Sequence, residues 1–166
     1  MRFTLIDRIV ELEVGRRITA VKSVSLAEEY LRDQFPRFPV LPGVLMLEAM
    51  TQAGAWLIRA TDDFADSLIL LREARNVKYA DFVAPGRTLE VSAEIKQREG
   101  RTTNLLARGS VDGVTAVSGR LTLEHFNLAD TNPEEATTDR YIKREMRELF
   151  ALLYRGSETA VESANN

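Results

Sequence analysis

Apolar and polar residues alternate near the start of the chain. Val10, Leu12 and Val14 are separated by two glutamates. This period of two predicts a half-buried strand with the three apolar side chains on one face. A turn at 15–17 follows, and the β-branched residues of 18–24 predict a second strand.

A stiff loop and a long apolar segment come next. Residues 26–34 are polar and predict a connection with a brief helix. Three prolines between 36 and 42 remove three backbone donors and hold each preceding residue extended. Such a loop can hold a reacting group in place. From Gly43 to Ala60 the apolar residues surround the helix axis, which predicts a helix in the middle of the fold.

The following pattern predicts an antiparallel meander. A short apolar strand at 67–71 continues at 75–79 beyond an irregular stretch, and three longer strands follow at 89–96, 102–111 and 114–126. Asp112-Gly113 is a strong signal for a two-residue hairpin between the last two strands.

The last forty residues have a different character. Residues 128–137 form a polar linker, and the tail at 156–166 is polar and predicted to be disordered. Between them, residues 138–155 predict an amphipathic helix whose apolar stripe must cover either the domain's own sheet or a partner chain. The stripe consists of Ile142, Met146, Leu149, Phe150 and Leu153.

Composition narrows the possible functions. A chain of 166 residues corresponds to one domain. It has no cysteine and one histidine, His125, which excludes disulfides, thiolate metal sites and multi-histidine metal sites. The balance of 22 basic and 25 acidic residues argues against a nucleic-acid partner or an anionic membrane surface. With neither a signal peptide nor a membrane span in view, we expect a cytoplasmic protein.

One carboxylate stands out as a candidate for chemistry. Glu48 lies in the otherwise apolar helix, where burying an unpaired carboxylate would be costly. Such a group suits a general acid or base, but it is equally compatible with a structural carboxylate paired to a cation. Gln52, one turn further on, can reach it. The first N–H groups of the helix, at Gly43 and Val44, have no intrahelical partners and can hold a polarised carbonyl oxygen.

For two further polar residues, the sequence alone gives little indication of a functional role. Gln34 has a neutral amide that does not titrate near neutral pH, and it resembles an ordinary loop residue. His125 lies near the end of the last predicted strand, and the sequence identifies no partner for it.

The stretch from Gln34 to Gln52, with its Phe-Pro pairs, Pro-Gly helix start and Glu48, resembles the signature of FabZ-type 3-hydroxyacyl-ACP dehydratases. Segments at 5–13, 76–79, 84–86 and 111–113 fit in the same order. The resemblance implies an α+β hot-dog fold over residues 1–127, with an antiparallel sheet wrapped around the long helix. It also implies a homodimer, or a higher oligomer of dimers, with sites shared across the interface. The substrate would be a thioester of acyl carrier protein or CoA, with neither a metal nor an organic cofactor.

The same resemblance implies residue roles. In the family, a loop histidine removes the α-proton and a helix carboxylate handles the departing hydroxyl group. Glu48 matches the carboxylate, and Gly43 and Val44 match the donors to the thioester carbonyl. The histidine position holds Gln34, whose amide cannot accept a proton. Apart from the resemblance, four residues are candidates for substrate binding: Phe35, Phe38, Gln52 and Phe82. For each of the three phenylalanines, a position in the hydrophobic core is an equally good interpretation.

Three hypotheses therefore remain. The protein is a dehydratase-type hydro-lyase that uses Glu48 alone or in an altered pair. Alternatively, it is a hot-dog thioesterase in which Glu48 attacks the thioester or activates water while Gln34 positions the substrate. The third possibility is a non-catalytic acyl-binding subunit with a histidine-bearing partner. Fold analogy does not choose among them.

Overall fold

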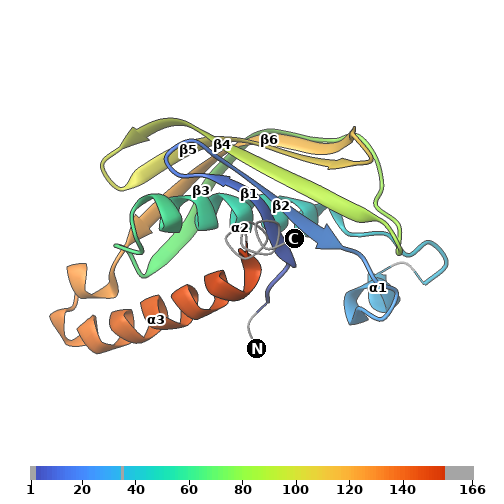
Figure 1. Ribbon diagram of the computed structural model, residues 1–166. Coiled ribbons are helices and arrows are strands. Elements are labelled where there is room, and N and C mark those ends of the chain that lie inside the picture. The colour runs from blue at the N-terminus through green and yellow to red at the C-terminus, as the bar shows by residue number, and fades with distance from the viewer. Residues whose placement is uncertain (1–2, 35, 156–166) are drawn as a thin grey trace, which may run out of the picture.

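The computed structural model describes residues 3–34 and 36–155, apart from the side chain of Gln34. Within these residues, six strands form one antiparallel sheet that curves around helix α2 (Gly43–Thr61), as Figure 1 shows. The strand order across the sheet is β1-β2-β4-β5-β6-β3. The strands are β1 (Arg8–Glu13), β2 (Arg17–Ser23), β3 (Leu68–Tyr79), β4 (Thr88–Glu99), β5 (Thr102–Val111) and β6 (Val114–Phe126). This is the predicted α+β arrangement of an antiparallel sheet around a long helix.

The first strand departs from the predicted alternation. A bulge between Ile9 and Glu11 leaves Val10 without a place in the ladder with β2. Ile9 is therefore buried, whereas Val10 is 40% exposed and Val14, in the turn, is 60% exposed. The prediction that Val10, Leu12 and Val14 share one half-buried face was wrong, because a bulge reverses which side chains face the core.

The predicted order of strands in the meander is confirmed, and the last two strands have the predicted bounds, whereas β4 is longer than the predicted 89–96. The irregular stretch in the middle of β3 is a pair of bulges that leave one continuous strand along β6. At the hairpin between β5 and β6, Asp112 and Gly113 have φ angles of 50° and 81°. Two consecutive positive φ angles are those of a type I′ turn, which matches the twist of the paired strands.

Helix α2 lies against the inner face of the sheet and supplies much of the core. Met50 and Leu57 are fully buried, and Trp56 is 4% exposed. Gly54 allows the close approach, because a Cβ at that position would lie 2.6 Å from Leu105 Cδ1 on β5. The predicted central position of this helix is confirmed.

The C-terminal part forms a third layer. Helix α3 (Ala136–Leu153) begins two residues earlier and ends two residues earlier than the predicted 138–155, and the linker contains two short 3-10 turns, η1 (Leu128–Asp130) and η2 (Pro133–Glu135). Figure 1 shows α3 on the side of α2 that faces away from the sheet. Its apolar stripe therefore covers the domain's own helix. The tail at 156–166 lies outside the described residues.

Aromatic contacts hold this third layer. The Phe150 ring centroid lies 6.0 Å from that of Trp56 and 5.6 Å from that of Phe64. Arg147 stacks over the Phe64 ring at 4.6 Å and binds Asp63. All these partners belong to the C-terminal half of α2 or the turn after it, so these contacts anchor α3 at that end of α2. No helix among the described residues is both long and apolar enough to cross a membrane.

Candidate active site

The end of the proline-rich loop is held in place by packing and backbone hydrogen bonds, and this fixes the start of α2. Val40 and Leu41 are buried, and the Leu41 N–H donates to Val83 O at 2.8 Å. Pro42 is the N-cap, and its carbonyl accepts from Leu45 N and Met46 N. The short helix α1 (Glu29–Gln34) precedes this loop, as the sequence predicts.

The two candidate carbonyl-binding donors lie at this helix start. In residues 3–34 and 36–155, no acceptor is present for the N–H groups of Gly43 and Val44. Gly43 also packs against β3, because a Cβ there would lie 3.0 Å from Tyr79 Cε1. The positive end of the helix dipole and two free N–H groups suit an oxygen that gains negative charge.

Glu48 lies one turn further along α2 and is half-buried. Gln52 Nε2 donates to Glu48 Oε1 at 3.0 Å, which confirms that the two side chains meet. The same amide group accepts from Leu5 N and donates to Phe3 O, both at 2.9 Å. Gln52 therefore fixes Glu48 and the N-terminal segment at once. Its hydrogen bonds make it a positioning residue for Glu48, and its role as a substrate ligand stays a prediction.

Two predicted lining residues lie together on the surface. The rings of Phe38 and Phe82 are 5.3 Å apart at an angle of 85°. Both are more than half exposed, as is the Val44 side chain. Exposed apolar side chains at a helix start provide a surface for an apolar chain. Phe35 lies outside the described residues, and so does the side chain of Gln34, whose backbone ends α1.

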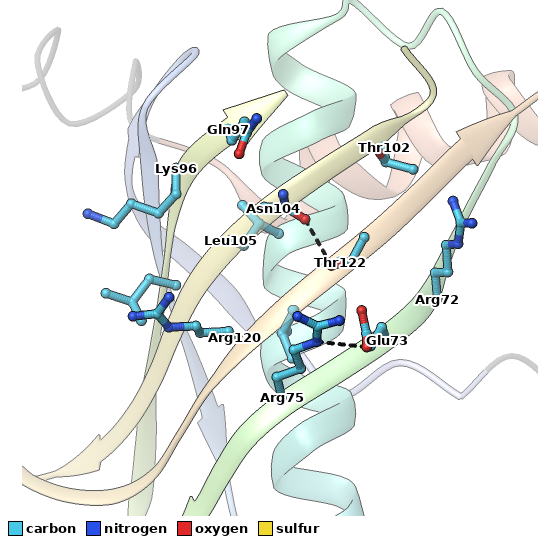
Figure 2. A pocket seen from close by; sticks show the side chains of 12 residues that line it. Arg72, Glu73, Arg75, Lys96, Gln97, Thr102, Asn104, Leu105, Arg120 and Thr122 are labelled. Carbon is cyan, nitrogen blue, oxygen red and sulfur yellow. Dashed lines mark hydrogen bonds and ion pairs between the residues drawn. The ribbon is translucent and has the colours of Figure 1, made fainter. Parts of the chain in front are cut away.

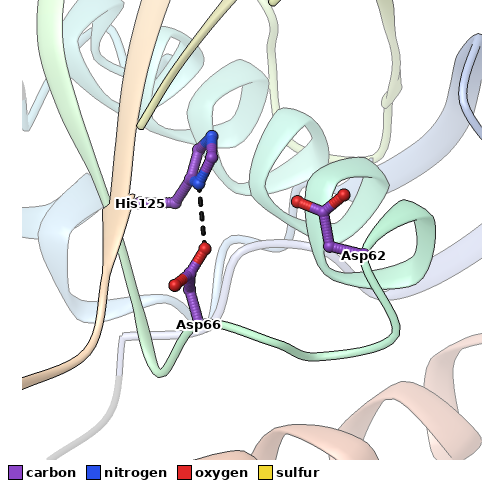
Figure 3. Close-up of side chains that lie close together, drawn as sticks. All are labelled: Asp62, Asp66 and His125. Atoms are coloured by element: carbon purple, nitrogen blue, oxygen red, sulfur yellow. Dashed lines mark hydrogen bonds and ion pairs between the residues drawn. The ribbon is translucent and has the colours of Figure 1, made fainter. Parts of the chain in front are cut away.

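A second polar cluster lies at the other end of α2, and the sequence singles out only its histidine. Figure 3 shows Asp62, Asp66 and His125 together. His125 is 5% exposed, its Nδ1 lies 2.9 Å from Asp66 Oδ2, and its Nε2 lies 3.2 Å from the Thr103 hydroxyl. A carboxylate only accepts hydrogen bonds, so Nδ1 is the donor in the contact with Asp66. The sequence shows no partner for His125 because Asp66 lies 59 positions away.

The same three side chains also form a candidate metal-binding site. The candidate ligand atoms of Asp62, Asp66 and His125 lie within 4.8 Å of one another. However, the Arg98 guanidinium donates hydrogen bonds to both carboxylate oxygens of Asp62, at 2.7 and 2.6 Å. The hydrogen bonds from Arg98 also hold the pKa of Asp62 below its ordinary value. A guanidinium thus already neutralises Asp62, and we interpret the cluster as one ion pair extended by hydrogen bonds, which ties β4, β6 and the end of α2 together.

Comparison with known proteins assigns the family. Residues 1–120 match the FabA-like domain family. The chain belongs to this family. It is 34% identical over 119 residues to a 3-hydroxyacyl-(acyl-carrier-protein) dehydratase FabZ of Ruminiclostridium cellulolyticum, covering 72% of this chain and 84% of that protein. It is 40% identical over 116 residues to the FabZ of Magnetococcus marinus, covering 69% and 76%.

Solved structures confirm the hot-dog fold of this FabA-like chain. A dehydratase heterocomplex from Xenorhabdus doucetiae aligns with a TM-score of 0.62 at 20% identity, covering 80% of this chain and 90% of that one. A thioesterase mutant from Pseudomonas aeruginosa aligns with a TM-score of 0.57 at 18% identity, covering 72% and 80%. The family match ends before α3, so the third layer is an addition to the matched domain.

Proposed function

We propose that this FabA-like chain acts on acyl thioesters at the N-terminal end of α2, with dehydration of 3-hydroxyacyl thioesters as its reaction. One observation carries the proposal. A half-buried carboxylate, Glu48, is held by Gln52 one turn from the two free N–H groups of Gly43 and Val44. The FabZ relatives are 3-hydroxyacyl-(acyl-carrier-protein) dehydratases, and we propose a thioester of the same carrier, or of CoA, as the substrate of this chain.

The proposed chemistry uses Glu48 as both base and acid. Its carboxylate accepts the proton from the carbon next to the thioester carbonyl, and the C–H electron pair becomes the new double bond. The bond from the third carbon to the hydroxyl oxygen breaks, and Glu48 returns the proton so that water leaves. The N–H groups of Gly43 and Val44 hold the carbonyl oxygen while it gains charge. The exposed Phe38 and Phe82 support the acyl chain, together with Phe35.

Gln34 favours a second candidate. An amide has no proton-accepting group that titrates near neutral pH, so Gln34 cannot replace a histidine base. It can orient a substrate by hydrogen bonding. With that support, Glu48 would activate water or attack the thioester carbonyl, and the products would be a free acid and a thiol. The third alternative is a non-catalytic acyl-binding subunit.

We also propose that the chain forms a homodimer through β3. This strand is at the end of the sheet order and is paired on one side, with β6. It is 12 residues long, and Leu70 and Tyr79 on it are each 50% exposed. A long strand edge with exposed apolar side chains is a site for pairing with a further strand. Sedimentation of the purified chain tests the dimer, and a monomer at micromolar concentration would contradict it.

The deciding experiment measures two activities on one wild-type sample. Thioesters of acyl carrier protein and of CoA are supplied as 3-hydroxyacyl and enoyl forms, and both hydration–dehydration and thiol release are followed. We expect interconversion of the two forms, with loss of about 10²–10⁴-fold in Glu48→Ala. The matched control is Glu148→Ala, which removes an exposed glutamate of α3. Thiol release that depends on Glu48 would instead identify a thioesterase.

A gain-of-function variant tests the role of residue 34. Gln34→His supplies a proton-accepting side chain at the family's histidine position. If dehydratase chemistry resides in this site, the rate of enoyl thioester hydration should rise. An unchanged rate would argue against the dehydratase hypothesis. Acyl-ligand binding without either activity in the wild type would identify the acyl-binding subunit.

A further inference from the structure

A polar groove crosses the outer face of the sheet, opposite the face that packs on α2. Figure 2 shows the polar side chains of its lining in front of the strands, with α2 behind them. The groove has a volume of about 890 Å³ and takes residues from β3, β4, β5 and β6. Because the sheet separates it from Glu48, a ligand in this groove is not the reacting thioester.

The groove concentrates positive charge on a chain whose net charge is −3. Four cationic side chains and one carboxylate line it. Arg75 pairs with Glu73 at 2.7 Å, and Lys96 pairs with Glu94 at 3.1 Å. Arg72 and Arg120 have no ion-pair partner within the described part of the chain. Two guanidinium groups are therefore available to an anion.

The rest of the lining is rich in neutral hydrogen-bonding groups. Gln97, Thr102, Asn104 and Thr122 contribute amides and hydroxyls, and Thr122 donates to Asn104 Oδ1 at 2.8 Å. Guanidinium groups match phosphate oxygens in a forked geometry, and hydroxyls and amides complete such sites. This lining suits phosphate better than an apolar ligand.

The size and composition of the groove limit the kind of ligand. A volume of about 890 Å³ falls within the usual range for small molecules. The lining includes no aromatic side chain on which a base of single-stranded nucleic acid could stack. We propose that this groove binds a small organic polyphosphate, with Arg72 and Arg120 as the principal cations. This site is additional to the proposed thioester site.

Calorimetric titration at low salt tests the proposal with three probes. Inorganic tripolyphosphate tests the shared phosphate chemistry, whereas ATP and CoA distinguish a nucleoside triphosphate from the nucleotide end of a carrier. We expect saturable binding of at least tripolyphosphate to the wild type, and weaker binding as added salt screens the exposed charges. Addition of the probe should also shift the side-chain amide NMR signals of Gln97 and Asn104. Absence of saturable binding by all three probes would overturn the proposal.

Variants then assign the site. The double substitution Arg72→Ala with Arg120→Ala should raise Kd at least about tenfold, because each removes a charge-assisted hydrogen-bond donor. The control Arg140→Ala removes an exposed arginine of α3 and should leave Kd within about twofold. An equal loss in the control would show diffuse attraction and overturn the site. Stronger binding of an oligonucleotide or an acidic carrier protein that tripolyphosphate does not displace would also overturn it.

Discussion

Gln52→Leu tests whether one amide organises the proposed active site. The substitution keeps the approximate size of the side chain but removes its polar atoms. Three hydrogen bonds disappear: from Leu5 N to Oε1, and from Nε2 to Phe3 O and to Glu48 Oε1. Leu5 is 2% exposed, so one of the two backbone groups that Gln52 binds belongs to a core residue, whereas the other belongs to the exposed Phe3.

The expected loss of stability follows from these contacts. A typical hydrogen bond contributes about 0.5–1.5 kcal/mol to the free energy of unfolding. Gln52 is only half-buried, so water can replace some of the lost partners. Three bonds at the lower end of the range give a loss of about 1.5 kcal/mol. Glu48 also loses its restraint, and we expect the rate of the Glu48-dependent reaction to fall by about 10-fold or more.

Urea unfolding followed by circular dichroism gives the free energy, and steady-state kinetics gives the rate. The control is Glu148→Leu, which places leucine at an exposed position of α3 and should change stability by less than about 0.5 kcal/mol. If Gln52→Leu is as stable and as active as the wild type, Gln52 does not position Glu48. A loss of stability with unchanged kcat would limit its role to the N-terminal segment.

Three further substitutions test the core and the added layer by urea unfolding. Phe150→Ala should lower the free energy of unfolding by about 3 kcal/mol, because it removes contacts with three aromatic rings. The control Leu152→Ala, at a 63% exposed position of the same helix, should have little effect. Equal effects of the two substitutions would contradict the packing of α3. Gly54→Val should cost about 2 kcal/mol or more by forcing Leu105 aside, and a neutral result would show that α2 can move away from the sheet. Asp139→Asn should cost about 1–2 kcal/mol at pH 7. Burial would raise the pKa of Asp139, but hydrogen bonds from the Ser67 hydroxyl and two backbone N–H groups outweigh it and lower that pKa. The wild type should therefore have a higher free energy of unfolding than Asp139→Asn at pH values above the unfolded-state pKa of Asp139, and this difference should shrink as the pH falls through the lower folded-state pKa. A difference that does not depend on pH would refute this account.

Local sequence signals predict the elements whose causes are local. The all-round apolar segment from Gly43 fixes α2, and Asp112-Gly113 fixes a turn because those residues tolerate positive φ. Glu48 and Gln52 meet because residues four apart share a helix face. In each case the information lies within a few residues, so no knowledge of the tertiary structure is needed.

Features that depend on pairing between distant segments are not accessible in this way. The bulge at Val10 is defined only by the register of β1 on β2. The partners of His125 come from the turn before β3 and from β5, and the guanidinium near them comes from β4. The basic groove joins cations from positions 72 to 120, which strand pairing alone brings together. None of these has a local pattern.

The two ends of α2 thus differ in the groups that surround them. The N-terminal end has the free N–H groups and Glu48, and its surroundings are exposed apolar side chains. The C-terminal end has the Arg98–Asp62 ion pair and the His125–Asp66 hydrogen bond, and α3 packs beside it. Asp139 joins that end to α3 by accepting from Ser67, which lies between α2 and β3. Because the added helix is anchored at the end of α2 remote from Glu48, it can stabilise the domain without closing the proposed thioester site. The addition of α3 to the matched family domain is therefore compatible with the family's chemistry.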